Sequence, residues 1–335
     1  MSAREIILCH PVRTAIGAYN GSLKSVPATE LGAVVVRETL RRAGLDADEI
    51  GSVVMGNVIQ AGNRMNPARQ ASIDGGVPVS VPAMTVNRVC GSGAQAIVTA
   101  AQEIRTGDID AAVAGGMENM DRAPYLMDGG RWGYRMGPAQ ILDSMLTDGL
   151  NDAFSGEHSG WHTEDLVTKL QITRAAQDAF AARSQQRFAA AQKVGRFVEE
   201  IVAIEVKGRK GIEALGRLAG YGVAAVEPGL FGLGPVPAVR KALDRAGWTL
   251  SDVERIEINE AFAAVPIAVA KELGLPEDII NVEGGAVAHG HPIGATGAIL
   301  TTRLLHSMKR DGLCKGVVTL CIGGGQGIAL ALEAA

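Results

Sequence analysis

Short apolar segments that alternate with amphipathic helices constrain the fold of this chain more than any other feature. In the first part of the chain, strand-like runs at 5–8, 52–55 and 111–115 alternate with helix-like segments at 28–43, 67–75 and 90–106. After Gly234 the pattern returns, with helices expected at 237–246, 261–273 and 294–309, strands at 255–258 and 280–282, and a closing hairpin of 316–321 and 327–332. Because helices that alternate with strands cover the faces of a sheet, this pattern predicts an α/β fold with mixed or mostly parallel sheets.

The middle of the chain interrupts this alternation. Gly, Arg, Asp and Met dominate residues 121–137, and residues 173–191 form an expected Ala/Gln-rich helix capped by Thr173. We therefore expect three parts. They are an α/β half over residues 1–117, an inserted loop subdomain over residues 118–218, and a similar α/β half over residues 219–335.

The composition excludes several classes of protein. The 335 residues are 47% hydrophobic and 20% charged, which is enough for two ordinary cores. The net charge is −4 without a long basic stretch, and this argues against nucleic acid as the main partner. The four cysteines are too scattered for a disulfide framework, no apolar run is long enough to span a membrane, and the first residues lack the pattern of a signal peptide. These features favour a cytoplasmic location.

Cys90 is the most informative single residue. Apolar residues at helical spacing after it predict a helix that begins close to the thiol: Ala94, Ile97, Val98, Ala101 and Ile104. The free amides and the positive dipole end of that first turn favour the thiolate, which is the nucleophilic form of cysteine. Gly91 and Gly93 leave the approach to the thiol open. On local sequence alone, a buried structural cysteine remains the alternative.

Three later segments also place polar or nucleophilic side chains at the ends of expected strands. They are residues 259–263 with Asn259, residues 284–297 with His289 and His291, and residues 320–327 with Cys321 and three glycines. In α/β sheets, active sites gather at such ends. Three other interpretations are zinc ligation by the histidines and cysteines, a core role for Cys321, and phosphate binding by the glycines. The cysteine spacing matches no usual zinc signature, and no Lys-Ser/Thr pair follows the glycines.

Together with residues 87–94, these three segments resemble the thiolase family, which comprises acetyl-CoA acetyltransferases and 3-ketoacyl-CoA thiolases. The resemblance extends to Pro-Val-Arg-Thr at 11–14, Gly-Gly-Met-Glu-Asn-Met at 115–120 and Gly-Pro-Val-Pro-Ala at 234–238, and it covers nearly the whole chain. It implies two similar βαβ-type halves with mixed sheets in a layered α/β/α/β/α arrangement, plus an inserted loop subdomain.

Carried over residue by residue, the resemblance implies a complete acyl-transfer site. Cys90 would accept the acyl group, and His291 would take its proton and point a ring nitrogen at the thioester oxygen. Asn259 would hold a water that completes this first oxyanion site, and Cys321 would be the second acid or base. The backbone amides of Cys90 and Gly323 would form a second oxyanion site. The acyl or pantetheine pocket would be lined by His158, Leu150, Ala261 and Phe262, with an ordinary surface histidine as the alternative for His158.

The resemblance also implies the reaction. An acyl-Cys90 intermediate would carry the acyl group through a ping-pong cycle that cleaves or forms 3-ketoacyl-CoA, with acetoacetyl-CoA and acetyl-CoA as the expected substrates. The alternatives are a degradative thiolase for longer chains, and a catalytically silent relative that binds acyl-CoA or lipid. No permanently bound cofactor and no metal are expected, and CoA thioesters enter as substrates. The expected assembly is a homodimer or a dimer of dimers, without nucleic acid or membrane partners.

At one place the sequence departs from the family. Between Lys207 and Tyr221 the family has a longer section, which supplies contacts to CoA and a strand of the first sheet, and several dozen residues are missing here. One interpretation is a true deletion, and the other is a sequence that joins two segments across a gap. We favour the gap, because loss of a strand would leave a sheet edge uncovered. An intact mass near 34.8 kDa would exclude it.

Overall fold

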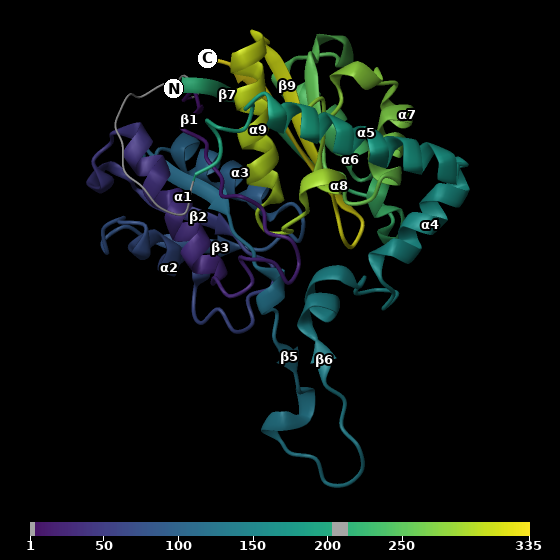
Figure 1. Cartoon of the computed structure of the whole chain (residues 1–335). Coiled ribbons are helices and arrows are strands. Elements are labelled where there is room, and N and C mark those ends of the chain that lie inside the picture. Colours follow the sequence, from purple (N-terminus) through teal and green to yellow (C-terminus); the bar gives the residue numbers. More distant parts are fainter. Residues whose placement is uncertain (1–3, 203–213) are drawn as a thin grey trace.

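The computed structural model describes residues 4–202 and 214–335, and these form two α/β halves with a long excursion between them (Figure 1). The first half contains β1 (Ile7–Cys9), α1 (Ala28–Ala43), β2 (Ser52–Gly56), α2 (Pro67–Asp74), β3 (Ala83–Val86), α3 (Ser92–Thr106) and β4 (Ala112–Gly116). The excursion contains β5 (Tyr125–Leu126), β6 (Leu142–Asp143), a π-helical turn (Met145–Leu150), α4 (Ser159–Leu170) and α5 (Arg174–Lys193). The second half contains β7 (Ala214–Ala225), α6 (Pro235–Ala246), β8 (Arg255–Ile258), α7 (Ala264–Leu273), α8 (Ala286–His289), α9 (Thr296–Asp311), β9 (Lys315–Ile322) and β10 (Gln326–Ala334).

Two sheets organise the halves. The sheet of the second half has the order β1-β7-β10-β9-β8, in which β8 and β9 are parallel and β10 is antiparallel to both of its neighbours. The sheet of the first half has the order β3-β2-β4 and is entirely parallel. The N-terminal strand β1 therefore pairs with β7 of the other half and not with its own sheet. The place between 207 and 221 where residues of the family are missing lies partly outside the described residues. Strand β7 runs across residue 218, where the sequence predicts a boundary between two parts.

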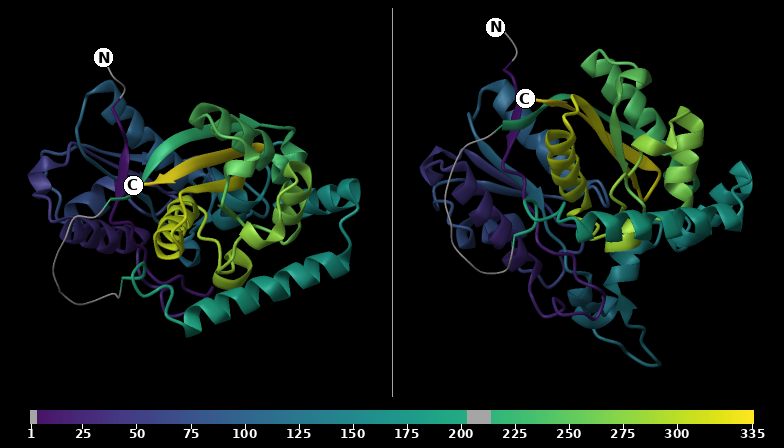
Figure 2. Two further views of the ribbon diagram at one scale, coloured as in Figure 1. Left: turned by 90° about the horizontal axis from the view of Figure 1, so that it is seen from above. Right: turned by 45° about the horizontal axis from the view of Figure 1, so that its top comes forward.

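Helices cover both faces of each sheet, which gives the expected layers. In β2, Val53 and Met55 pack against α1 and α2, whereas Val54 between them packs against α3. In β9, Val318 and Leu320 pack against α9, and the alternate residues face α6 and α7. The period of two along each strand thus separates an outer and an inner helix layer. Figure 2 shows α3 and α9 between the two sheets, so the order of layers is α/β/α/β/α.

The two inner helices cross at small residues. A Cβ on Gly297 of α9 would lie 2.3 Å from the backbone nitrogen of Ala94 in α3, and a Cβ on Gly93 would lie 2.8 Å from the nitrogen of Ala298. Only glycine allows this approach of two backbones. The crossing involves the first turn of both helices, so it brings the segment before α3, with Cys90, close to the segment before α9, with His291.

The predicted strand at 280–282 is wrong in its extent. Only Ile280 forms a bridge, to Ile256 of β8. Asn281 has a φ of 44°, and its side chain takes over the pairing: its Oδ1 accepts from the nitrogen of Ile258 at 2.8 Å, and its Nδ2 donates to the oxygen of Ile258 at 2.8 Å. A side-chain amide thus replaces the backbone of a third strand. The closing hairpin is confirmed as β9 and β10.

The excursion carries a hairpin that projects away from both halves. Strands β5 and β6 form its two-stranded sheet at the bottom of Figure 1. Its tip exposes large apolar side chains, among them Trp132 and Met136 at 85% each. Helices α4 and α5 then return to the second half, where α5 lies against α8. Among the described residues, no helix is long and apolar enough to cross a membrane.

Candidate active site

Cys90 stands on a tight turn between β3 and α3. The residue before it, Val89, has a φ of 44°, which is a strained conformation for a β-branched side chain. Hydrogen bonds hold this turn, because the Val89 nitrogen donates to Asn87 Oδ1 at 2.9 Å and the Ser92 hydroxyl donates to the Val89 oxygen at 2.7 Å. The turn ends one residue before the N-cap of α3, Gly91. The backbone therefore fixes the position of the thiol.

Cys90 is half-buried, and the loss of hydration decides the protonation state of its thiol. Loss of hydration raises the pKa of Cys90 to about 11, although the backbone N–H groups of Gly323 and of Cys90 itself donate to the sulfur and lower it. The neighbouring Glu118 raises it further. Backbone amides thus favour the thiolate, but the desolvation penalty exceeds their stabilisation, so the pKa rises overall. The two amides are those that the sequence predicts for the second oxyanion site.

His291 is held in one tautomer. The Thr296 hydroxyl donates to the oxygen of Pro292 at 2.9 Å, so it accepts from His291 Nδ1, which lies 2.7 Å away. The remaining ring nitrogen, Nε2, lies 3.2 Å from Nδ2 of Asn259 and accepts from it. Burial lowers the pKa of His291 to about 4. The imidazole is therefore neutral at pH 7 and carries its unprotonated lone pair on Nε2, the state a general base needs.

Asn259 follows β8 directly and is completely buried. Its Oδ1 has no hydrogen-bond partner among the described residues. A buried amide oxygen of this kind retains the capacity to accept a hydrogen bond from a small ligand or a water. The predicted pair of Asn259 and His291 is thus brought together in the structure.

Cys321 and Gly323 lie at the β9–β10 turn. Cys321 is fully buried, and burial together with the neighbouring Cys90 raises its pKa far above the usual range. The turn itself requires glycine, since Gly324 and Gly325 both have a φ of 79° and a Cβ on Gly325 would lie 2.4 Å from the oxygen of Val226. This geometry directs the Gly323 amide at the Cys90 sulfur.

The predicted pocket residues come from two elements that meet. The Ser159 hydroxyl, at the start of α4, donates to the oxygen of Leu150 at 2.7 Å. His158 caps α4, because its Nδ1 accepts from the Gly160 nitrogen at 3.0 Å. A Cβ on Gly160 would lie 3.9 Å from the ring of Phe262, which with Ala261 follows Asn259 and Glu260. Leu150 and His158 belong to the excursion, and Ala261 and Phe262 belong to the second half, so the predicted pocket residues lie where these two parts meet.

Glu118 is a site residue that sequence reasoning missed. Its carboxylate accepts hydrogen bonds from Asn57 Nδ2 at 2.8 Å, from the Val58 nitrogen at 3.0 Å and from the Gly294 nitrogen at 3.0 Å. It therefore joins the ends of β2 and β4 to the segment that carries His291. Its partners are dozens of residues away in sequence, so no local pattern identifies it.

The buried carboxyl of Glu118 predicts a pH-dependent stability. Loss of hydration raises its pKa from 4.5 to about 7. A raised pKa means that the folded state binds the proton more tightly, so its contribution to stability is largest at low pH and declines as the pH rises from 4.5 to 7. We expect the free energy of unfolding of wild type minus that of Glu118→Gln to be about 3 kcal/mol larger at pH 5 than at pH 8. Denaturant titrations at the two pH values measure it, and a difference that does not change with pH would contradict the assignment.

Thr296 is a second residue that sequence reasoning missed, and it acts through His291. In Thr296→Val the Nδ1–H loses its acceptor, so the other tautomer becomes available and the lone pair leaves Nε2. We expect kcat for thiolysis to fall about 10- to 100-fold with KM nearly unchanged, and the pH profile to shift. Thr296→Ser should restore both, since it keeps the hydroxyl. Thr301→Val is the matched control, because Thr301 is equally buried on α9 but its hydroxyl bonds to Gly297.

His289, the other histidine of residues 284–297, has different partners from those of His291. His289 Nε2 lies 2.9 Å from Nη1 of Arg303, and its Nδ1 lies 2.9 Å from the oxygen of Gly290. Within residues 4–202 and 214–335, no group of three or more His, Cys, Asp and Glu side chains is arranged to hold a metal ion.

Comparison with known proteins agrees with this geometry. The chain matches the model of the thiolase N-terminal domain over residues 6–217 and that of the thiolase C-terminal domain over residues 212–334. It is 45% identical to an acetyl-CoA acetyltransferase of Pseudomonas aeruginosa over 389 aligned positions, which cover 98% of this chain and 99% of that protein. It is 41% identical to the cytosolic acetyl-CoA acetyltransferase of Mus musculus over 389 positions, with 98% of each chain covered.

A solved structure extends the comparison to the fold. The crystal structure of the Bacillus anthracis acetyl-CoA acetyltransferase superposes with a TM-score of 0.95 at 35% identity and covers 100% of both chains. The alignments to the two relatives run over more positions than the 335 residues of this chain, so the relatives contain residues that have no counterpart here. On the two domain matches and the full-length relatives, the chain belongs to the thiolase family.

Proposed function

We propose that this protein is an acetyl-CoA C-acetyltransferase that cleaves acetoacetyl-CoA with CoA and catalyses the reverse condensation. The proposal rests on one observation above the others. A thiol, a second thiol and two backbone amides meet at the ends of β3 and β9, and the crossing of α3 and α9 brings the loop with a neutral imidazole, whose lone pair is on Nε2, close to them. Full-length relatives that carry this name support the choice of substrate.

In the first half of the cleavage, Cys90 is the nucleophile. As its sulfur attacks the keto carbon of acetoacetyl-CoA, the thiol proton passes to His291 Nε2. The bond between C2 and C3 breaks, the acetyl group stays on the sulfur, and the electron pair remains on C2 as the enolate of acetyl-CoA. The Cys321 thiol, kept protonated by burial, donates the proton that converts this enolate to acetyl-CoA.

In the second half, CoA releases the acetyl group. The Cys321 thiolate takes the proton of the incoming CoA thiol, whose sulfur attacks the acetyl carbon. The tetrahedral oxyanion lies between the amides of Cys90 and Gly323, and donors of this kind contribute on the order of 3 kcal/mol each. Cys90 then leaves as a thiolate and recovers its proton from His291, which returns the site to its starting state.

Asn259 and His291 form the other oxyanion site in this proposal. The imidazolium produced by the first proton transfer donates from Nε2 to the thioester oxygen. A water held by the unpartnered Oδ1 of Asn259 supplies the second donor and stabilises the enolate charge. The pantetheine and acyl pocket would be lined by Leu150, His158, Ala261 and Phe262.

Thiolysis by the full-length wild type tests the activity. With acetoacetyl-CoA and CoA we expect loss of the 3-ketoacyl-CoA absorbance and formation of acetyl-CoA. An absence of CoA-dependent cleavage would favour the silent, acyl-CoA-binding alternative. A comparison with 3-ketooctanoyl-CoA decides between the short-chain enzyme and the degradative one, since only the latter would cleave the longer substrate at a higher kcat/KM.

We further infer an assembly of two or four copies in the cytoplasm, without a permanently bound cofactor or metal. Exposed Trp132 and Met136 at the tip of the β5–β6 hairpin support this, because large apolar side chains on a projecting element are typical of a protein interface. The hairpin would bridge two dimers. Sedimentation of the wild type against Trp132→Ser measures this, and an unchanged mass would contradict it.

A further inference from the structure

The pair of Asn259 and His291 is built from two separate segments of the chain. Asn259 follows β8 and His291 follows α8, yet Asn259 Nδ2 lies 3.2 Å from His291 Nε2. This distance depends on how α8 is placed relative to the end of β8. A displacement of about 1 Å in such a pair can lower a rate on the order of 10²-fold. A residue that joins the two segments therefore controls the geometry of the pair.

Glu260, the residue after Asn259, joins these two segments. It is 3% exposed, and its Oε2 accepts a hydrogen bond from the Val287 nitrogen of α8 at 3.0 Å. The same oxygen accepts from the Ser184 hydroxyl of α5 at 2.7 Å, and that hydroxyl accepts from the Gly285 nitrogen at 3.0 Å. One carboxylate thus holds α8 directly, and it holds the N-cap of α8 through one hydroxyl.

The other oxygen of Glu260 faces a donor whose orientation is fixed. Asn281 Nδ2 donates to Glu260 Oε1 at 2.8 Å and also to the oxygen of Ile258 at 2.8 Å. Asn281 Oδ1 accepts from the Ile258 nitrogen, so the Asn281 amide cannot turn over without losing both bonds to β8. The Val287 nitrogen is a backbone group and can only donate. Both oxygens of Glu260 therefore require an acceptor.

The backbone before α8 lies directly against this carboxylate. A Cβ on Gly285 would lie 2.3 Å from Cδ of Glu260 and 2.5 Å from its Oε1. Only glycine allows this contact, because a side chain would displace either the carboxylate or the backbone. The position of Glu260 and that of α8 are therefore coupled by packing as well as by hydrogen bonds.

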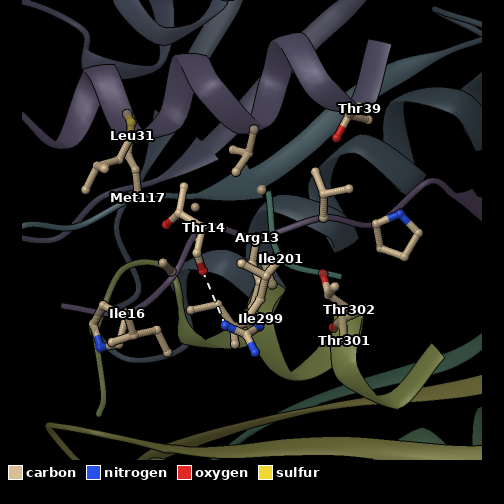
Figure 3. Close-up of a pocket in the computed structure, with 18 of the residues that line it drawn as sticks. Arg13, Thr14, Ile16, Leu31, Thr39, Met117, Ile201, Ile299, Thr301 and Thr302 are labelled. Atoms are coloured by element: carbon tan, nitrogen blue, oxygen red, sulfur yellow. Dashed lines mark hydrogen bonds between the residues drawn. The ribbon is translucent and has the colours of Figure 1, made fainter. Parts of the chain in front are cut away.

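The segment that carries His291 also borders a cavity. Among the described residues, 288–292 line a cavity of about 880 Å³, whereas Glu260 does not line it. Figure 3 shows this cavity with Thr301 and Thr302 of α9 on its wall. A segment at the edge of a cavity lacks packing partners on that side. The position of His291 therefore depends on polar contacts such as those of α8 with Glu260.

We propose that Glu260 is a positioning residue, whose carboxylate holds α8 against the end of β8 and so sets the distance between Asn259 and His291. The inference rests on the proposed function, in which this pair binds the thioester oxygen and stabilises the enolate. Thioester exchange instead places its oxyanion between the amides of Cys90 and Gly323. Loss of the Glu260 carboxylate should therefore slow cleavage of the carbon–carbon bond more than exchange of the acetyl group.

Glu260→Gln keeps the size of the side chain and replaces one acceptor with a donor. Wherever its NH2 group is placed, it faces another donor, either Asn281 Nδ2 or the Val287 nitrogen. Because a buried donor that faces a donor is unfavourable, α8 should move away from β8.

Glu257→Gln is the matched control. Glu257 is also a buried carboxyl, at 1% exposed, and it lies in β8. Its Oε2 has no hydrogen-bond partner among the described residues, so the substitution does not break a contact of that oxygen with α8. Ser184→Ala is the second variant, because it removes one of the three donors to Glu260 and leaves the carboxylate in place.

Two rates separate positioning from a general loss of structure. One is thiolysis of acetoacetyl-CoA, and the other is exchange of the acetyl group between acetyl-CoA and isotope-labelled CoA. We expect Glu260→Gln to lower kcat for thiolysis about 10- to 100-fold with KM nearly unchanged. The fall in the exchange rate should be about five times smaller, because its oxyanion site is intact. Ser184→Ala should show the same split at a smaller size, and Glu257→Gln should keep both rates. Equal falls of the two rates in Glu260→Gln and Ser184→Ala would overturn the proposal.

Nitrogen NMR of protein labelled at its six histidines reports the geometry without any need for activity. The His291 signals are assigned from their loss in His291→Asn. In Glu260→Gln, the Nε2 signal of His291 should move toward that of an imidazole nitrogen without a hydrogen bond, since Asn259 no longer donates to it at the same distance. The signal should stay in place in Glu257→Gln. An unchanged signal in Glu260→Gln would overturn the proposal. A shifted signal in a protein whose wild type shows no thiolysis would support the positioning and contradict only the proposed function.

Discussion

Cys90→Ala is expected to lower the rate of acetoacetyl-CoA thiolysis by at least about 10⁴-fold while the protein stays folded. The variant removes the sulfur that forms the acyl bond, and the second thiol of the site, Cys321, does not replace it, because it is the acid and base of the proposed cycle. After incubation with acetyl-CoA, intact mass spectrometry should find one acetyl group on the wild type and none on the variant. Cys314→Ala is the control, since Cys314 is an exposed free cysteine away from the site.

The same residue makes a prediction about pH. Loss of hydration raises the pKa of Cys90 to about 11 and lowers that of His291 to about 4, so both groups favour the neutral form at pH 7. We therefore expect the proton to move as the sulfur attacks bound substrate. Without substrate, alkylation of Cys90 by iodoacetamide should be slow at pH 7 and should accelerate up to about pH 11. Rapid alkylation at pH 7 that protects the protein from later acetylation would contradict a neutral resting thiol.

The net pKa of the Cys90 thiol depends on contacts that the local sequence does not contain. Residues 87–94 place Cys90 beside free amides, and the structure has amides at the sulfur, from Gly323 and Cys90 itself. What a linear pattern does not contain is the burial, which comes from the excursion and from the β9–β10 turn more than 200 residues later. Local patterns predict which groups meet, whereas the free energy of ionisation depends on everything that displaces water around them.

Other differences between the sequence-based predictions and the structure also arise from contacts that a linear pattern does not contain. The resemblance to the thiolase family predicts the layers, and the pattern of apolar residues predicts α3, α9 and the closing hairpin. The sequence did not identify Glu118 and Thr296, because their roles depend on partners that are distant in sequence or known only from the fold: Glu118 accepts from Asn57, Val58 and Gly294, and Thr296 fixes the tautomer of His291. The strand at 280–282 was wrong because the Asn281 side chain pairs with Ile258 in place of a backbone. The pairing of β1 with β7 depends on contacts between halves, which periodicity does not describe.

His291→Asn is expected to lower kcat for thiolysis about 10²- to 10⁴-fold, because the variant loses both the base for Cys90 and the donor to the thioester oxygen. Wild-type kcat/KM should be level across pH 5 to 8 without an inflection at 6.5, since burial lowers the pKa of His291 to about 4. A rate that rises through pH 6.5 in wild type would contradict a buried neutral imidazole. A variant with more than a tenth of wild-type kcat would contradict its role as the base.

His291→Asn should also change how the free energy of unfolding depends on pH, which measurements of activity do not report. A folded-state pKa below 6.5 means that the neutral imidazole stabilises the fold, with the contribution complete above pH 6.5 and lost as the pH falls to about 4. Glu118 acts in the opposite direction over a similar range, so the wild type alone conceals both effects. The free energy of unfolding of wild type minus that of His291→Asn should therefore be about 3 kcal/mol smaller at pH 4 than at pH 7. For Glu118→Gln, the free energy of unfolding of wild type minus that of the variant is instead larger at low pH. Urea titrations of the two single variants and of the double variant separate the contributions of His291 and Glu118. Additive changes would mean that the base and the carboxyl titrate independently, whereas strong coupling would show that the hydrogen bond from Gly294 to Glu118 transmits ionisation to the His291 loop.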